Sequence, residues 1–119
     1  MEQIKFKFED LKVYQKTLIF IDDVYSTTDT FPKKEEYRLT SQFIRAVQSI
    51  AFNIAEGSGD TNAQFNRFLR IALGSLKECV VCVTIAFRRK YISETLKNKL
   101  RFQAQEISKM IIGLIKYLK

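Results

Sequence analysis

Two cysteines three positions apart, Cys79 and Cys82, have the residue type and spacing that come nearest to a reactive site. A C-x-x-C pair works in redox reactions when a thiol is exposed at a helix N-terminus, where its pKa is lowered. This pair lies inside the apolar run CVVCV instead, which predicts two buried, inert thiols. The chain has no histidine, and two cysteines alone do not complete a zinc site. We therefore expect no metal and no cofactor.

A second group of polar residues brackets an uncharged segment. Arg45 and Glu56 are about three helical turns apart, so both point to the same side of a helix, with Asn53 between them. The group lacks the nucleophile, histidine base or metal that catalysis would need. It predicts a structural network, in which Glu56 accepts hydrogen bonds at the start of the next helix and Arg45 pairs with a carboxylate of another helix or another chain. We expect no catalytic residue and no enzymatic activity.

The cations gather in the second half of the chain. Residues 1–60 hold eight Lys and Arg against ten Asp and Glu, whereas residues 61–119 hold twelve against three. Clustered cations bind polyanions because counterions are released when phosphates are neutralised. A solvated face that only keeps the protein soluble would show the same imbalance. The candidate nucleic-acid-binding residues are Arg67, Arg70, Lys77, Arg88, Arg89, Lys90, Lys97 and Arg101.

The elements that must position these residues are four amphipathic helices, predicted at about 9–28, 34–56, 62–89 and 94–118. In each one, apolar residues recur at intervals of three and four. With 119 residues and short connections, the chain predicts one domain, an all-α antiparallel up-down-up-down four-helix bundle. The predicted stripe of the first helix consists of Leu11, Tyr14, Leu18, Ile21 and Tyr25.

Small residues suggest how the middle helices pack. Gly74 inside the third helix costs about 1 kcal/mol relative to alanine, so we expect another helix to approach it closely. Gly57-Ser58-Gly59 ends the second helix, Thr61 caps the third with Gln64 reaching back, and Ser93 caps the fourth. The second and third helices are predicted to form a tight antiparallel hairpin through two small stripes: Ala46, Ser49 and Asn53, facing Ala72, Ser75, Cys79, Cys82 and Ala86.

The apolar stripes at residues 43–55 and 110–118 are wider than one bundle core requires. Self-association into a homo-oligomer would cover the excess, and a thick core in a small monomer is the alternative. No apolar run approaches the roughly 18 to 20 residues that span a bilayer, and the N-terminus lacks an apolar signal core. We expect a cytoplasmic protein without a membrane partner.

Several motifs in a fixed order resemble the bacterial four-helix-bundle proteins encoded in intervening sequences of 23S ribosomal RNA genes. They are FEDLKVYQK at 8–16, FP at 31–32, YRLTSQ at 37–42, NIAEGSG at 53–59 and ALGSL at 72–76 with Glu78. The resemblance covers nearly the whole chain. It implies an all-helical bundle that forms a ring-like homopentamer in relatives, with no catalytic residues in the family pattern. Two positions depart from it: Ala51 replaces a proline that would kink the second helix, and Lys90 replaces a turn glycine.

The chain is also distantly similar to the accessory variability proteins of diversity-generating retroelements, which bind nucleic acid and a reverse transcriptase. We therefore expect a non-enzymatic, homo-oligomeric accessory protein that binds structured RNA or DNA through the basic surface of the third and fourth helices. No base-reading motif is present, so binding would depend on shape and charge. The alternative is a protein-interaction scaffold for an acidic protein partner, with no nucleic-acid role.

Overall fold

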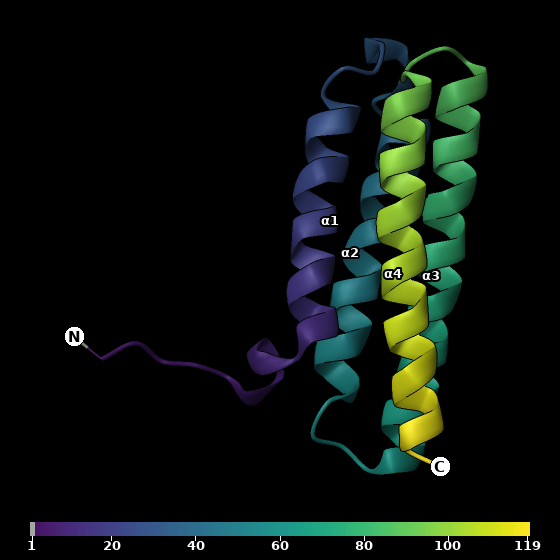
Figure 1. The fold of residues 1–119 in the computed structure, drawn as a ribbon. Coiled ribbons are helices and arrows are strands. Elements are labelled where there is room, and N and C mark those ends of the chain that lie inside the picture. Colours follow the sequence, from purple (N-terminus) through teal and green to yellow (C-terminus); the bar gives the residue numbers. More distant parts are fainter. Residues whose placement is uncertain (1) are drawn as a thin grey trace.

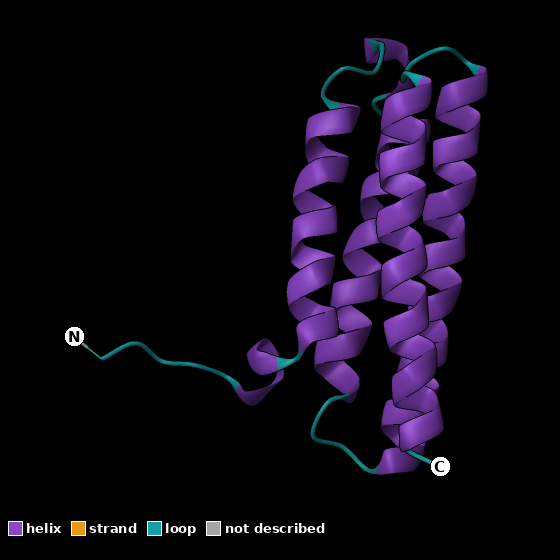
Figure 2. Cartoon of the chain, in the orientation of Figure 1, coloured by secondary structure: helices purple, strands orange, loops and turns teal. Residues whose placement is uncertain are grey.

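The computed structural model describes residues 2–119, which form a bundle of four long helices (Figure 1). The chain runs alternately up and down, so α1 lies beside α2 and α4, and α3 lies beside α2 and α4. No strand occurs within this range (Figure 2), and no helix in it is long and apolar enough to cross a membrane. The predicted all-α four-helix bundle is confirmed. The elements are η1 (Lys7–Asp10), α1 (Lys12–Thr28), η2 (Lys33–Glu35), α2 (Leu39–Gly57), α3 (Asn62–Arg88) and α4 (Glu94–Tyr117).

The predicted helices begin too early in the first half of the chain. Residues 7–10 form the short 3-10 helix η1, and the extended backbone of Leu11 separates it from α1. Residues 33–35 form η2, and Arg38, with φ −124° and ψ −106°, interrupts the chain before α2 begins at Leu39. The predicted ends of α3 and α4 are correct within one residue. Periodicity therefore located the helices but not the short turns that lead into two of them.

The N-caps of α3 and α4 are those expected. The hydroxyl of Thr61 accepts a hydrogen bond from the Gln64 amide, and the hydroxyl of Ser93 accepts one from the Leu96 amide. The prediction that the Gln64 side chain would reach back and accept a hydrogen bond from the Thr61 amide is wrong. Asp60 takes its place, because its carboxylate already accepts the Thr61 amide at 2.7 Å.

The buried face of α1 differs from the predicted stripe. Leu18 and Tyr25 are exposed, whereas Thr17 is fully buried. Thr17 can enter the core because its hydroxyl donates to the carbonyl of Val13 at 2.7 Å, which leaves no unsatisfied donor. Because threonine is counted as a polar residue in sequence analysis, the predicted stripe was placed one residue away from the face that is buried. The core residues of α1 are Val13, Thr17, Phe20 and Val24, with Leu11, Tyr14 and Ile21 partly buried beside the core.

The contact between α2 and α3 is the most extensive in the bundle, which confirms the predicted hairpin. Across it, the hydroxyl of Ser75 donates to that of Ser49 at 2.8 Å. Gly57 allows the close approach, because a Cβ added there would lie 2.7 Å from Cβ of Phe68. The expectation for Gly74 is wrong within one chain: it is exposed, and no atom lies within 4 Å of where its Cβ would be.

The two turn positions flagged in the sequence adopt left-handed backbone conformations. Gly59, after α2, has φ 86°, so it rather than Gly57 provides the sharp turn. Lys90, after α3, has φ 65° although it carries a side chain. Lys90 therefore makes the turn in a conformation that glycine would adopt without strain, and it is one strained residue in the turn.

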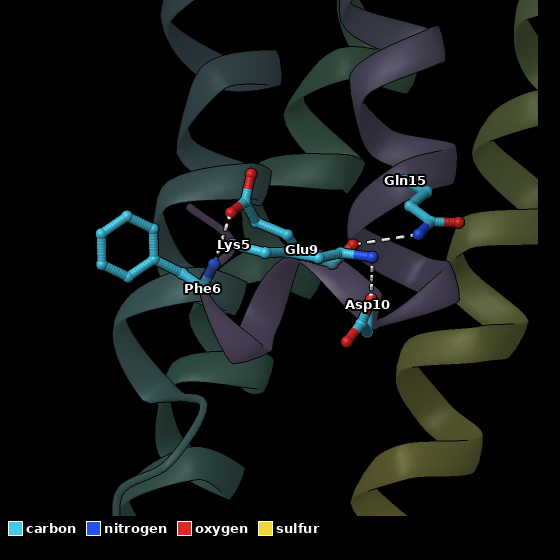
Figure 3. A network of polar contacts seen from close by, with 5 residues as sticks. All are labelled: Lys5, Phe6, Glu9, Asp10 and Gln15. Atoms are coloured by element: carbon cyan, nitrogen blue, oxygen red, sulfur yellow. Dashed lines mark hydrogen bonds and ion pairs between the residues drawn. The ribbon is translucent and has the colours of Figure 1, made fainter. Parts of the chain in front are cut away.

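The segment before α1 leaves the bundle as an arm (Figure 1). Figure 3 shows how η1 anchors it: the Glu9 carboxylate accepts the Phe6 amide at 2.7 Å, and Gln15 of α1 donates to the Glu9 carbonyl at 3.0 Å. Lys5 forms an ion pair with Asp10. Beyond η1, the side chains of Ile4 and Phe6 remain exposed.

Candidate nucleic-acid interface

The candidate cations lie along α3, the α3–α4 turn and the first half of α4. At 1.5 Å per residue, Arg67 and Arg88 are about 30 Å apart along α3, close to the length of one turn of duplex DNA. Arg70, Lys77 and Arg88 fall within about 20° of one another around the helix axis, and Arg67 is turned away by about 60°. On an ideal helix, three of the four members of the predicted stripe therefore share one face. We call the surface formed by Arg67, Arg70, Lys77, Arg88, Arg89, Lys90, Lys97 and Arg101 the basic face.

The side chains of the basic face are available to a ligand. All are exposed except Lys97, which is half-buried, with Nζ 4.2 Å from the ring centroid of Phe87. The guanidinium of Arg70 donates to Asn66 at 2.7 Å, and that of Arg67 lies over Phe68. Within residues 2–119, no member of the basic face forms an ion pair with a carboxylate. The positive charge of this surface is therefore not neutralised within the described part of the chain.

A groove of about 430 Å³ between α3 and α4 brings two of these cations together. Lys77 lies on one wall and Arg101 on the other. Phe102, with 60% of its surface exposed, also lines the groove. No carboxylate does. The remaining lining residues are apolar or neutral and polar: Leu73, Leu76, Val80, Ala104, Asn98, Gln105 and Ser108.

Sequence reasoning missed the aromatic and neutral polar residues of this groove. Phe102 falls outside the apolar stripe of α4, in which Leu100 and Ala104 are buried. A large aromatic residue next to Arg101, on the polar side of an amphipathic helix, was the signal that could have identified it. Asn98, Gln105 and Ser108 give no such signal, because neutral polar residues are ordinary on an exposed helix face.

The contact between α1 and α4 shows how this bundle neutralises its cations elsewhere. Lys16 lies 3.8 Å from the Glu106 carboxylate, and Lys99 lies 3.7 Å from that of Asp23. Gln103 also donates to Asp23, at 2.6 Å. The α1–α4 contact is thus bridged by paired groups, whereas the cations of the α3–α4 groove have no carboxylate partner within residues 2–119.

The groove between α2 and α3 contains Arg45 and Asn53 of the predicted structural network. Asn53 donates to the hydroxyl of Ser49, which in turn accepts from Ser75. Within residues 2–119, Arg45 and Glu56 form no hydrogen bond or ion pair through their side chains. The prediction that Glu56 accepts hydrogen bonds at the start of α3 is therefore wrong, because Asp60 and Thr61 accept there. Asn53 is connected to the serines rather than to the two charges. Pairing of Arg45 or Glu56 with another chain stays a prediction.

The polar groups of this α2–α3 groove are mostly bonded to one another. Gln42 donates to the carboxylate of Glu78 at 3.1 Å, so the single acid of α3 is directed toward α2 and away from the basic face. Phe52 lines the groove and is exposed. The carboxylate and the internal hydrogen bonds make this groove a poorer anion site than the one between α3 and α4.

The cysteines are buried, as the sequence predicts. Both thiols are free, and burial raises their pKa values, that of Cys82 to about 11. A thiolate is the reactive form, so neither residue is activated for chemistry. Within residues 2–119, no group of three or more His, Cys, Asp or Glu side chains could hold a metal ion.

One polar contact ties the α3–α4 turn to η2. The hydroxyl of Tyr91 donates to the Glu35 carboxylate at 2.7 Å, and its ring packs against Phe31. This hydrogen bond lowers the pKa of Glu35 and raises that of Tyr91. It steadies the turn from which Arg88, Arg89 and Lys90 project.

Comparison with known proteins supports the fold over nearly the whole chain. A family model described as 23S rRNA-intervening sequence protein matches residues 9–113. A crystal structure of a protein of unknown function from the S23 ribosomal protein family of Bacteroides thetaiotaomicron is similar, with 26% sequence identity and a TM-score of 0.80. The match covers 87% of this chain and 98% of that one. No curated protein matches the chain.

Proposed function

The chain belongs to the 23S rRNA-intervening sequence protein family, and we propose that it is a non-enzymatic, homo-oligomeric protein that binds structured nucleic acid through its basic face. The observation that carries this proposal is the set of eight cations on α3, α4 and the turn between them, none of which has a carboxylate partner within residues 2–119. Phosphates are the ligands that such a surface attracts most strongly, because their counterions are released on binding. The family name supports RNA as the first nucleic acid to test.

Self-association is supported by apolar residues on the outer side of α3. Ile71, Val81 and Ile85 are exposed and lie at the helical spacing of one stripe, in which the exposed Gly74 and Glu78 fill the two positions between them. A second copy packed there would cover these residues and account for a glycine that nothing approaches within one chain. Five copies is the assembly that the family resemblance implies. Ile71 shares a hollow with Arg67 and Arg70, and Ile85 shares one with Arg88 and Arg89, so a copy packed on this stripe would also cover cations of the basic face on α3. Lys77 and Arg101 line the α3–α4 groove, which none of these apolar residues lines, and would stay accessible.

The nucleic-acid role is tested by titrating a structured RNA hairpin at several salt concentrations. We expect affinity to fall steeply with salt, and the double variant Lys77→Glu/Arg101→Glu, whose residues lie away from the apolar stripe of α3, to bind weakly and with a shallower slope, by about 0.7–0.9 per lost phosphate contact. The matched control is Lys12→Glu/Lys33→Glu, which has the same net charge but alters exposed lysines outside the basic face. Equal loss in both variants, or no binding at low salt, would contradict the proposal and favour an acidic protein partner.

Oligomerisation is tested separately by light scattering at micromolar concentration. We expect a mass of several chains for the wild type and of one chain for Val81→Glu/Ile85→Glu. A wild-type mass of a single chain would remove the homo-oligomeric part of the proposal while leaving the nucleic-acid part intact.

A further inference from the structure

The groove between α3 and α4 combines an exposed aromatic residue with cations, whereas the basic face is defined by cations alone. Phe102 presents an exposed aromatic ring there, between two helices that each contribute a cation. Aromatic rings stack on the faces of unpaired nucleobases, and they do so for every base because each base has a π-face. Lys77 and Arg101 lie in the same groove and carry charge opposite to that of a phosphate. The aromatic ring and the two cations are therefore complementary to the base and the phosphate of one nucleotide.

The neutral polar residues of the groove are free to contact the edge of a base. Amide side chains such as those of Asn98 and Gln105 both donate and accept hydrogen bonds, as does the hydroxyl of Ser108. Within residues 2–119, none of these three side chains has a hydrogen-bond partner. In the α2–α3 groove, by contrast, the polar groups beside Phe52 are bonded to one another and Glu78 adds a negative charge.

The shape of the groove distinguishes unpaired from paired nucleic acid. Its volume of about 430 Å³ admits a nucleoside, but a base reaches the ring of Phe102 only if it has left the stack of a duplex. A duplex would contact the outward cations of the basic face and leave the groove empty. We propose that the α3–α4 groove binds an unpaired nucleotide, with its base stacked on Phe102 and its phosphate held by Lys77 and Arg101. This inference rests on the proposed nucleic-acid role.

The test compares a single-stranded RNA dodecamer with a twelve-base-pair RNA duplex, using the full chain. We expect Phe102→Leu to weaken single-strand binding about 5- to 150-fold, the contribution of one stacked base, and to leave duplex binding unchanged. Phe102→Tyr should restore the loss, because it keeps an aromatic ring. The matched control is Tyr37→Leu, which removes an exposed aromatic residue outside the groove.

A fluorescent base gives a second readout. An oligonucleotide with 2-aminopurine should be quenched on binding wild-type protein and less quenched by Phe102→Leu at saturation. Loss of single-strand and duplex affinity to the same extent in Phe102→Leu would overturn the inference, as would no loss in either. If the wild type binds neither probe at low salt, the proposed function itself fails. If Phe102→Leu changes only the mass in light scattering, the groove is covered by a second copy and the inference is wrong.

Discussion

Gln103 on α4 donates a 2.6 Å hydrogen bond to Oδ2 of Asp23 on α1, and this bond joins the first and last helices of the bundle. The same carboxylate lies 3.7 Å from Nζ of Lys99. The donor in this bond is Nε2 of the Gln103 amide, whereas the amide oxygen, Oε1, is buried and has no partner within residues 2–119. Together with the Lys16–Glu106 ion pair, Asp23 therefore makes the α1–α4 contact polar as well as apolar.

Replacement of Asp23 by alanine should lower the free energy of unfolding by about 1–2 kcal/mol, because a hydrogen bond to a charged group is lost and the Gln103 amide is left unpaired. Gln103→Leu should cost less, since it also removes the unsatisfied oxygen. Lys99→Ala should change stability by less than about 1 kcal/mol, as expected for an exposed ion pair. Urea unfolding of the three variants measures their losses of unfolding free energy. A larger loss for Lys99→Ala than for Asp23→Ala would contradict the prediction.

Two glycine-to-alanine variants should have opposite effects. Gly57→Ala places a Cβ 2.7 Å from Cβ of Phe68, so α2 and α3 must separate, at a cost of about 1–3 kcal/mol. Gly74→Ala meets no atom within 4 Å and should stabilise the folded chain by about 0.5–1 kcal/mol through helix propensity. Thermal unfolding compares them. A fall in oligomer mass for Gly74→Ala would show that a second copy approaches this position.

The contribution of the Tyr91–Glu35 hydrogen bond should depend on pH. Because the pKa of Glu35 is lowered in the folded state, the bond stabilises the protein above the ordinary Glu pKa of 4.5, and this contribution is lost as pH falls through the lowered value. Because the pKa of Tyr91 is raised, the contribution is also lost as pH rises above its ordinary 10.0 and through the raised value. Tyr91→Phe keeps the ring against Phe31 and should be less stable than the wild type at pH 7.

The comparison is made by thermal unfolding from pH 2 to pH 8. The difference between wild type and Tyr91→Phe should shrink toward the acid end. A difference that stays constant over this range would show that packing of the ring, rather than the hydrogen bond, is responsible.

The two thiols should react only when the helices open. Burial raises the pKa values of both, so thiolate is scarce at neutral pH as well as hidden. A disulfide reagent that releases a coloured thiolate should therefore modify Cys79 and Cys82 slowly in the native protein. The rate of modification should rise with denaturant concentration in parallel with unfolding. Fast modification of either residue without denaturant would contradict its burial.

The sequence predicted the fold because each helix carries a regular apolar pattern, and it predicted the α2–α3 hairpin because Ser49 and Ser75 belong to small-residue stripes. It failed where a polar residue was buried: Thr17 satisfies its hydroxyl within its own helix, which composition does not reveal. It also failed at Gly74, since a glycine in a helix shows that space is available but not what occupies it.

The candidate interface was predicted only in part. Charge counting identified Lys77 and Arg101, but it could not show that both line one groove with Phe102, because that depends on how α3 and α4 are rotated about their axes. The positions of Arg45 and Glu56 suggested a network in which Glu56 accepts hydrogen bonds at the start of α3 and Arg45 pairs with a carboxylate, yet hydrogen bonding in the α2–α3 groove involves Asn53 and the serines instead.

The tight contact between α2 and α3 also has a kinetic consequence. These helices are neighbours in the chain, and only residues 58–61 separate them, so their contact forms at a small entropic cost of loop closure. We expect this hairpin to be the most protected part of the molecule in hydrogen exchange, with α1 and α4 opening first. Transient detachment of α4 would separate the two walls that hold Lys77 and Arg101. Local unfolding of α4 would therefore also open the proposed ligand groove.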